Sequence, residues 1–136
     1  MGEKIFIDTN IFLELFLDGE KADECEQFLK SLKNKNEEPI TTDFVVYSWF
    51  IIVERRLKSG NALKTLHLFF SNFTSLNILR LDFNEIYNGI NIIDEYNLDF
   101  DDSLVVACMR TYGIEKLASL DRHFDKVKDI KRISLF

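Results

Sequence analysis

Short apolar segments alternate with longer amphipathic segments along the chain, and this alternation constrains the fold more than any other feature of the sequence. The short segments that we expect to form strands are residues 4–7, 39–42, 76–81, 116–120 and 130–135. Between them, apolar residues recur at spacings of three and four, which is typical of helices that bury one face. Strands separated by helices favour right-handed crossovers and a parallel sheet covered on both faces. We therefore expect an α/β domain, with a parallel sheet of about five strands flanked by helices on both faces.

The helices are expected between these strands. Their ranges are residues 11–17, 22–32, 43–58, 63–73, 85–96 and a last helix that starts at Asp102. Gly113 would end that last helix, because the residue after a helix often takes the left-handed conformation that glycine tolerates. In the segment 85–96, the spacing predicts that Ile86, Ile90 and Ile93 face inward.

The composition indicates one domain over residues 1–136, since this length fits one ordinary domain and no linker rich in Gly, Pro or Ser is present. Hydrophobic residues make up 46% and charged residues 29% of the chain, which excludes a disordered protein. The formal net charge of −6 excludes a protein held to nucleic acid by a general excess of positive charge. An acidic site that reaches phosphate groups through bound metal ions stays compatible with this charge.

The sequence carries no sign of secretion or membrane attachment. The N-terminal residues lack the apolar core of a signal peptide, and the longest apolar runs are much shorter than a membrane span. Cys25 and Cys108 are far apart and form no Cys-x-x-Cys motif, so we expect two reduced, packed thiols. These features predict a soluble, cytoplasmic protein with no membrane partner.

Acidic residues follow the expected strands at equivalent positions. Asp8 comes directly after the first strand, Asp121 after the fourth, and Asp102 starts a helix, preceded by Asp99 and Asp101. Parallel strands bring such residues to one edge of the sheet, where open α/β sheets bind ligands. Gathered carboxylates repel one another unless a cation lies among them, and oxygen ligands favour Mg²⁺ or Mn²⁺. Taken singly, Asp8 or Asp102 is more often a helix cap than a metal ligand, and Asp121 could be a turn residue, so the hypothesis of a metal site depends on their shared position.

Three motifs resemble the PIN domain family. Residues 6–12 (FIDTNIF) look like its opening strand followed by Asp-Thr-Asn, and residues 98–107 (LDFDDSLVVA) look like its central block, in which Asp-(Ala/Ser)-Leu begins a helix. Residues 117–125 (LASLDRHFD) are similar to its late block, a strand followed by Thr/Ser-x-Asp-x-x-Phe. The motifs occur in the family's order and span essentially the whole chain. In size the chain resembles the VapC toxins, which are stand-alone PIN domains.

This resemblance implies a metal-dependent endoribonuclease that hydrolyses RNA phosphodiester bonds, as the toxin of a toxin–antitoxin pair with a cognate antitoxin protein as partner. It implies that Asp8, Asp102 and Asp121 are the catalytic residues and hold Mg²⁺ or Mn²⁺, with Asp101 as a further ligand. The residues expected to support them are Thr9, Asn10, Ser48, Asp99 and Ser119.

Ser48 is the one departure from the family's pattern, because it stands where a second acidic residue is usual. Glu54 is the nearest carboxylate on the same expected helix, six residues later. Six residues turn a helix by about 600°, so Glu54 points about 120° away and about 9 Å further along the axis. Glu54 cannot replace the missing acid, and we expect a metal site with one carboxylate fewer.

Two alternatives stay open, and Ser48 favours the first of them. The first is a catalytically impaired PIN domain that acts as an RNA-binding or protein-assembly module. The second is a phosphate-handling α/β protein with a CheY-like acidic pocket, although the chain lacks an adjacent acidic pair after its first strand.

Residues 49–53 are apolar almost all round the helix, which predicts either a buried core or the face of a homodimer. His123, close to Asp121, is expected in a surface turn, with a contact to phosphate as its alternative.

Overall fold

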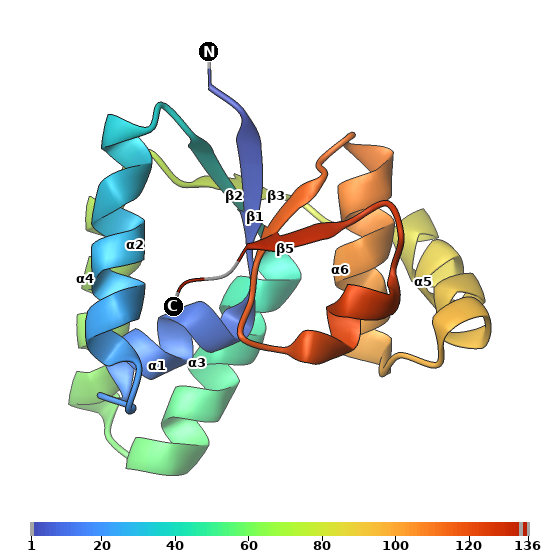
Figure 1. Cartoon of the computed structure of the whole chain (residues 1–136). Helices are drawn as coiled ribbons and strands as arrows, with labels where there is room; N and C mark the ends of the chain where they lie inside the picture. The colour runs from blue at the N-terminus through green and yellow to red at the C-terminus, as the bar shows by residue number, and fades with distance from the viewer. Residues whose placement is uncertain (1, 134, 136) are drawn as a thin grey trace.

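The computed structural model describes residues 2–133 and 135, which form a parallel sheet covered by helices on both faces (Figure 1). The elements in chain order are β1 (Lys4–Ile7), α1 (Thr9–Phe16), α2 (Ala22–Asn34), β2 (Glu38–Thr42), α3 (Asp43–Leu57), α4 (Gly60–Asn72), β3 (Asn77–Leu79), α5 (Asn84–Tyr96), α6 (Phe100–Thr111), β4 (Lys116–Ala118), the 3-10 helix η1 (Arg122–Lys126) and β5 (Lys131–Ile133). The strand order is β3-β2-β1-β4-β5, and every neighbouring pair is parallel. The predicted α/β class and the five parallel strands are therefore confirmed.

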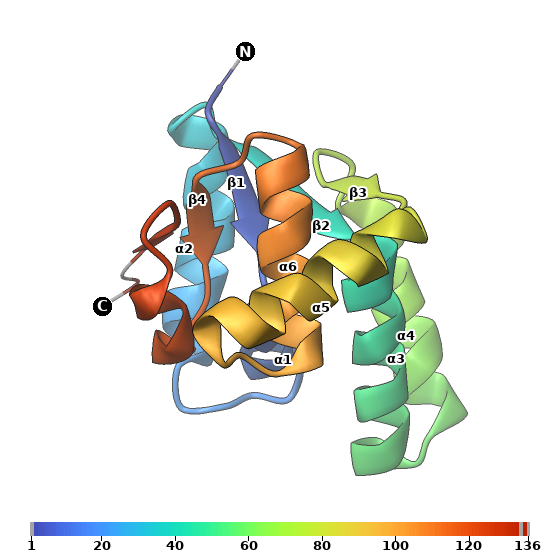
Figure 2. The same cartoon turned by 90° about the vertical axis from the view of Figure 1, so that its right-hand side faces the viewer.

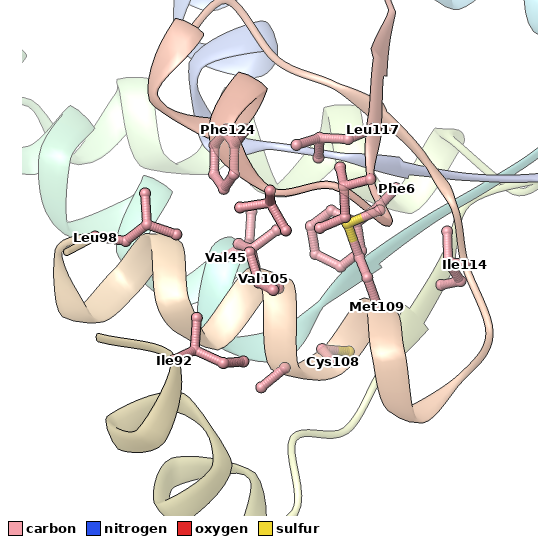
Figure 3. Close-up of a cluster of buried hydrophobic side chains, with 14 of the residues drawn as sticks. Phe6, Val45, Ile92, Leu98, Val105, Cys108, Met109, Ile114, Leu117 and Phe124 are labelled. Atoms are coloured by element: carbon pink, nitrogen blue, oxygen red, sulfur yellow. The ribbon is translucent and has the colours of Figure 1, made fainter. Parts of the chain in front are cut away.

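The central strand β1 separates two hydrophobic clusters. Successive side chains of a strand point to opposite faces, so Ile5 and Ile7 pack into one cluster and Phe6 into the other. The Phe6 side contains Leu117 of β4 and Met109 of α6 (Figure 3). Figure 2 shows α6 against the sheet with α5 outside it, and α2 on the opposite face. Because the side chains of β1 are buried on both faces, the position of its last residue, Ile7, is fixed. The point where the chain turns into α1 is fixed with it.

The boundaries differ from the sequence predictions by a few residues. The strand expected at 76–81 covers 77–79, and the strand expected at 116–120 covers 116–118. The helix expected to start at Asp102 begins at Phe100. Of the strand expected at 130–135, residues 131–133 are confirmed, and residue 134 lies outside the described residues. Gly113 has φ of 66°, so its predicted left-handed conformation is confirmed.

The inward face of α5 was predicted wrongly. Ile90 is 47% exposed, while Ile86 and Ile93 are half-buried. The buried positions are Glu85, Gly89 and Ile92. Gly89 explains the difference, because a Cβ there would lie 3.0 Å from Leu104 Cδ2, and its absence lets α5 approach α6 closely along this face.

The apolar stretch 49–53 is largely part of the core. Trp49 and Val53 are fully buried, and the Trp49 ring packs 4.9 Å from Phe12 and 4.7 Å from Phe70 between ring centroids. Ile51 is exposed. The core interpretation is therefore confirmed for Trp49 and Val53. The burial of this stretch does not test the prediction of a homodimer.

Two other predictions concern solubility and the thiols. Cys25 and Cys108 are buried and unpaired, as expected. Within residues 2–133 and 135, the helices are all too short or too polar to cross a membrane.

Candidate functional site

A pocket of about 230 Å³ lies at the carboxyl ends of β1 and β4, where the topology predicts a ligand site. Among the residues that line it are Asp8, Thr9, Asn10, Ser48, Asp101, Asp102 and Asp121. The structure thus brings together most of the site residues predicted from the sequence, from four separate segments of the chain. Two predicted residues lie beside the pocket: Ser119 is buried beneath it, and Asp99 is exposed immediately before α6.

A larger pocket of about 530 Å³ lies elsewhere, between α1, α2 and α4. Its walls are mostly apolar, with Leu15, Leu29 and Phe73 among them, and Glu26 is its single carboxylate. It offers no group of metal ligands, so the smaller acidic pocket is the candidate site.

Asp8 is held at the bottom of the acidic pocket. It follows β1 and caps α1, and its residue is 6% exposed. Its Oδ1 accepts a hydrogen bond from the Thr9 N–H (2.8 Å), and its Oδ2 accepts one from Ser119 Oγ (2.8 Å). Burial, together with the smaller effect of the charges of Asp101 and Asp121, raises the pKa of Asp8 to about 6, although the two hydrogen bonds oppose this rise. Asp8 is thus buried, with both oxygens oriented.

Ser119 connects three segments through one hydroxyl group. Besides donating to Asp8, its Oγ accepts hydrogen bonds from Asn10 Nδ2 (3.1 Å) and from the Asp121 N–H (3.1 Å). A serine hydroxyl has one donor and two acceptor positions, so all three are used. Asn10 Oδ1 in turn accepts from the Leu120 N–H (3.1 Å). Asn10 and Ser119, two of the expected supporting residues, thus belong to one hydrogen-bond network with Asp8.

Asp102 lies in the first turn of α6. Burial first, and then the charges of the neighbouring carboxylates, raise its pKa to about 7; these carboxylates are Asp101, Asp8, Asp121 and Asp99. The exposed Asp101 accepts a hydrogen bond from the Asp102 N–H (3.0 Å) and also lines the pocket. Four carboxyl groups line the pocket, and the described residues of its lining include no Lys or Arg.

Asp121 caps η1, the short helix that follows β4. Its Oδ1 accepts from the His123 N–H (2.9 Å), and His123 Nδ1 lies 3.1 Å from the same oxygen. One ligand atom each of Asp102, Asp121 and His123 lies within 4.8 Å of the other two. His123 was expected in a surface turn, and its side chain is 70% exposed in η1. The sequence signal for its closeness to the site was its spacing of two residues from Asp121.

Arg132 is a supporting residue that the sequence analysis missed. From β5 its guanidinium group binds Asp125 with two hydrogen bonds (2.7 and 3.1 Å), and its Nη1 donates to the Ser119 carbonyl (3.3 Å). The contact crosses from β5 to the end of β4, so it depends on the pairing of these strands. A linear sequence gives no direct signal for it.

Ser48 and Glu54 lie as helix geometry predicts. Ser48 is half-buried and lines the pocket, with Val45 and Ile52 on the same face of α3. Glu54 is exposed and is not among the residues that line the pocket. The pocket wall formed by α3 therefore presents a hydroxyl group and apolar side chains.

The donors of the pocket fit a divalent metal ion. Asp8, Asp102 and Asp121 supply carboxylate oxygens, which are the ligands that Mg²⁺ and Mn²⁺ prefer. Asp8 and Asp102 have raised pKa values because burial and neighbouring negative charges disfavour their ionised forms. A cation among them would relieve both effects.

A parallel sheet with an acidic pocket at the carboxyl ends of its strands is the arrangement to be compared with known families. The model of the PIN domain family matches residues 5–130, so the chain belongs to the PIN domain family. Comparison with curated protein sequences gave no significant match.

Solved structures agree with this fold over nearly the whole chain. The toxin VapC20 of Mycobacterium tuberculosis, titled a sarcin–ricin loop cleaving toxin, is 18% identical with a TM-score of 0.74, covering 91% of this chain and 95% of VapC20. VapBC2 of Rickettsia felis, bound to a DNA fragment from its promoter, is 16% identical with a TM-score of 0.75, covering 96% and 97%. A toxin–antitoxin complex of Klebsiella pneumoniae is 15% identical with a TM-score of 0.71, covering 97% and 98%. The resemblance to VapC toxins in fold is thus confirmed.

Proposed function

We propose that this protein is a metal-dependent endoribonuclease of PIN/VapC type, which hydrolyses RNA phosphodiester bonds with Mg²⁺ or Mn²⁺. The observation that carries the proposal is the meeting of Asp8, Asp102 and Asp121 in one pocket at the carboxyl ends of the strands. Membership of the PIN domain family supports it, because nuclease activity is typical of the family.

In the proposed reaction, Asp8, Asp102 and Asp121 hold the metal and Asp101 adds a further carboxylate. A bound divalent ion would supply an activated water and would stabilise the charge that develops on the phosphodiester. Ser119 donates a hydrogen bond to Asp8 Oδ2, and Asn10 donates one to Ser119 Oγ, so this chain of bonds restricts the rotation of the Asp8 carboxylate. Thr9 adds the hydrogen bond of its N–H to the other oxygen.

We also propose that the protein is the toxin of a toxin–antitoxin pair and acts on RNA in the cytoplasm. Support comes from structural neighbours that are titled as toxin–antitoxin complexes, including the Klebsiella pneumoniae and Rickettsia felis structures. A homodimer is a further part of this proposal. Exposed apolar side chains on α3 and α5, among them Tyr47, Ile51 and Tyr87, offer a surface for it.

The experiment that tests the activity compares wild type with Asp8→Asn on single-stranded RNA, with Mg²⁺, with Mn²⁺ and with EDTA. Asparagine keeps the helix cap but removes the charge, so the fold is retained and metal-dependent cleavage is expected to fall at least a hundredfold. Asp94→Asn, at an exposed position on α5, is the matched control and is expected to cleave as wild type does. Cleavage that survives both EDTA and Asp8→Asn would contradict the proposal.

A second candidate function rests on Ser48 alone: a catalytically impaired PIN domain that binds RNA or assembles with protein. The VapC structural neighbours favour the first function. A pocket wall without a carboxylate offers fewer ligands than the family's usual site. If wild type binds RNA at low salt but does not cleave it with either metal, this second function replaces the first.

A further inference from the structure

The proposed metal site has a nitrogen ligand within reach. The sequence contains two histidines, and His123 places a ring nitrogen in the same group as one oxygen each of Asp102 and Asp121, all within 4.8 Å of one another. Two ligands that bind one ion at about 2.1 Å are at most about 4.2 Å apart, so a small side-chain rotation suffices to bring all three onto one ion. The His123 side chain is 70% exposed, which leaves it free to make that rotation.

The backbone around His123 is fixed although its ring is exposed. Asp121 caps η1 by accepting from the His123 N–H (2.9 Å), and the next residue, Phe124, is fully buried. Arg132 ties η1 to β4, because it binds both Asp125 and the Ser119 carbonyl. The imidazole is therefore carried on an anchored turn, within reach of Asp102 and Asp121 of the pocket.

Ser48 explains why a further ligand matters in this chain. The α3 side of the pocket provides a hydroxyl group, so the carboxylates come from β1, α6 and the start of η1. A site with one carboxylate fewer leaves one more coordination position of a six-coordinate ion to water or to another protein ligand. An imidazole nitrogen can fill such a position, and it favours transition metals over Mg²⁺.

We propose that His123 supplies a nitrogen ligand to the divalent ion that Asp102 and Asp121 hold, and that it shifts the preference of the site from Mg²⁺ towards Mn²⁺. This inference rests on the proposed metal site. With His123, the ligands of the ion would include one nitrogen atom, whereas the carboxylates supply oxygen atoms alone.

The test measures Mn²⁺ directly by pulsed electron paramagnetic resonance, in the full chain and without RNA. A directly bound imidazole gives a ¹⁴N coupling to Mn²⁺, which is expected in wild type and absent in His123→Asn. His67→Asn is the matched control, because His67 is the other histidine and lies exposed on α4. That variant is expected to keep the coupling.

Calorimetric titrations with Mn²⁺ and Mg²⁺ give the second readout. His123→Asn is expected to weaken Mn²⁺ binding about tenfold and Mg²⁺ binding much less, with an unchanged Tm in EDTA because the side chain is exposed.

Equal weakening for both ions would contradict the assigned preference. Mn²⁺ binding without a ¹⁴N coupling would overturn the inference while leaving the metal site intact. Wild type that binds no Mn²⁺ would overturn the metal site itself. If metal binding is unchanged in His123→Asn while RNA binding in EDTA weakens, His123 contacts phosphate and the inference fails.

Discussion

Ser119 Oγ donates a hydrogen bond of 2.8 Å to Asp8 Oδ2, and this bond joins the ends of the two neighbouring strands β4 and β1. The oxygen is fully committed, since Asn10 and the Asp121 N–H donate to it. One buried hydroxyl therefore sets both the direction of the Asp8 carboxylate and the start of the turn that carries Asp121.

Ser119→Ala is expected to destabilise the protein by about 1–3 kcal/mol, because it removes a buried hydrogen bond and leaves two donors without an acceptor. Since that bond lowers the pKa of Asp8, its loss raises this pKa further and weakens Mn²⁺ binding at pH 7. Urea denaturation and calorimetry measure the two effects. Ser71→Ala, which removes an exposed hydroxyl on α4, should change neither. Mn²⁺ affinity equal to that of wild type in Ser119→Ala would contradict the orienting role.

Ser48→Glu is expected to strengthen Mn²⁺ binding about tenfold or more and to increase cleavage of RNA. The reason is that a carboxylate on this wall of the pocket adds a full negative charge and oxygen ligands, where the hydroxyl adds a weak dipole. Ser71→Glu is the matched control, since Ser71 is an exposed serine on α4 and does not line the pocket. In the Asp8→Asn background the gain should disappear, because both residues act on one site. A gain that Ser71→Glu reproduces would show a general charge effect instead.

The metal-free protein is expected to lose stability as the pH rises from about 4 to about 7. The pKa of Asp8 is raised to about 6 and that of Asp102 to about 7, from 3.8. In this range the folded state binds more protons than the unfolded state, so the free energy of unfolding falls with increasing pH. Asp125 and Asp129, whose pKa values are lowered by Arg132 and Arg110 respectively, act only at lower pH.

Thermal melts in EDTA at several pH values check this expectation. Asp102→Asn should flatten the dependence, and millimolar Mn²⁺ should restore the Tm of wild type at pH 7.5 through its binding to the folded state. A Tm that stays level between pH 5 and pH 7.5 in EDTA would contradict the raised pKa values.

The proposed homodimer is expected to depend on the exposed apolar side chains of α3 and α5. Tyr87 is 68% exposed on α5, and Tyr87→Glu should yield a monomer of 16.0 kDa by light scattering where wild type has twice this mass. Leu68→Glu changes an exposed apolar residue on α4 and should leave the dimer intact. Monomeric wild type at micromolar concentration would contradict the prediction.

The acidic pocket could be predicted because a parallel topology determines where the residues that follow the strands lie. Once β1 and β4 are identified as parallel strands, their carboxyl ends lie at one edge, and Asp8 and Asp121 meet there. Asp102 is brought to the same place because α6 leads back towards β4. The hydrophobic pattern locates the strands, and the aspartates are then found directly after them in the sequence.

Contacts between side chains of distant elements could not be predicted in the same way. Glu85 of α5 is buried because Thr111 of α6 donates a hydrogen bond of 2.6 Å to it, although a charged residue normally indicates an exposed position. Arg132 likewise acquires its role only when β5 pairs with β4. In each case the partner lies on another element, and periodicity along one helix or strand carries no information about it.

The bond between Asp8 and Ser119 spans 111 residues, and Arg132 holds the Ser119 carbonyl from a point still later in the chain. During translation, Asp8 therefore leaves the ribosome long before the groups that orient it have been made. The Asp8–Ser119 bond cannot form before Ser119 has emerged from the exit tunnel, and the support from Arg132 comes later still. The order of synthesis therefore makes the orientation of Asp8 one of the last steps in the assembly of the pocket.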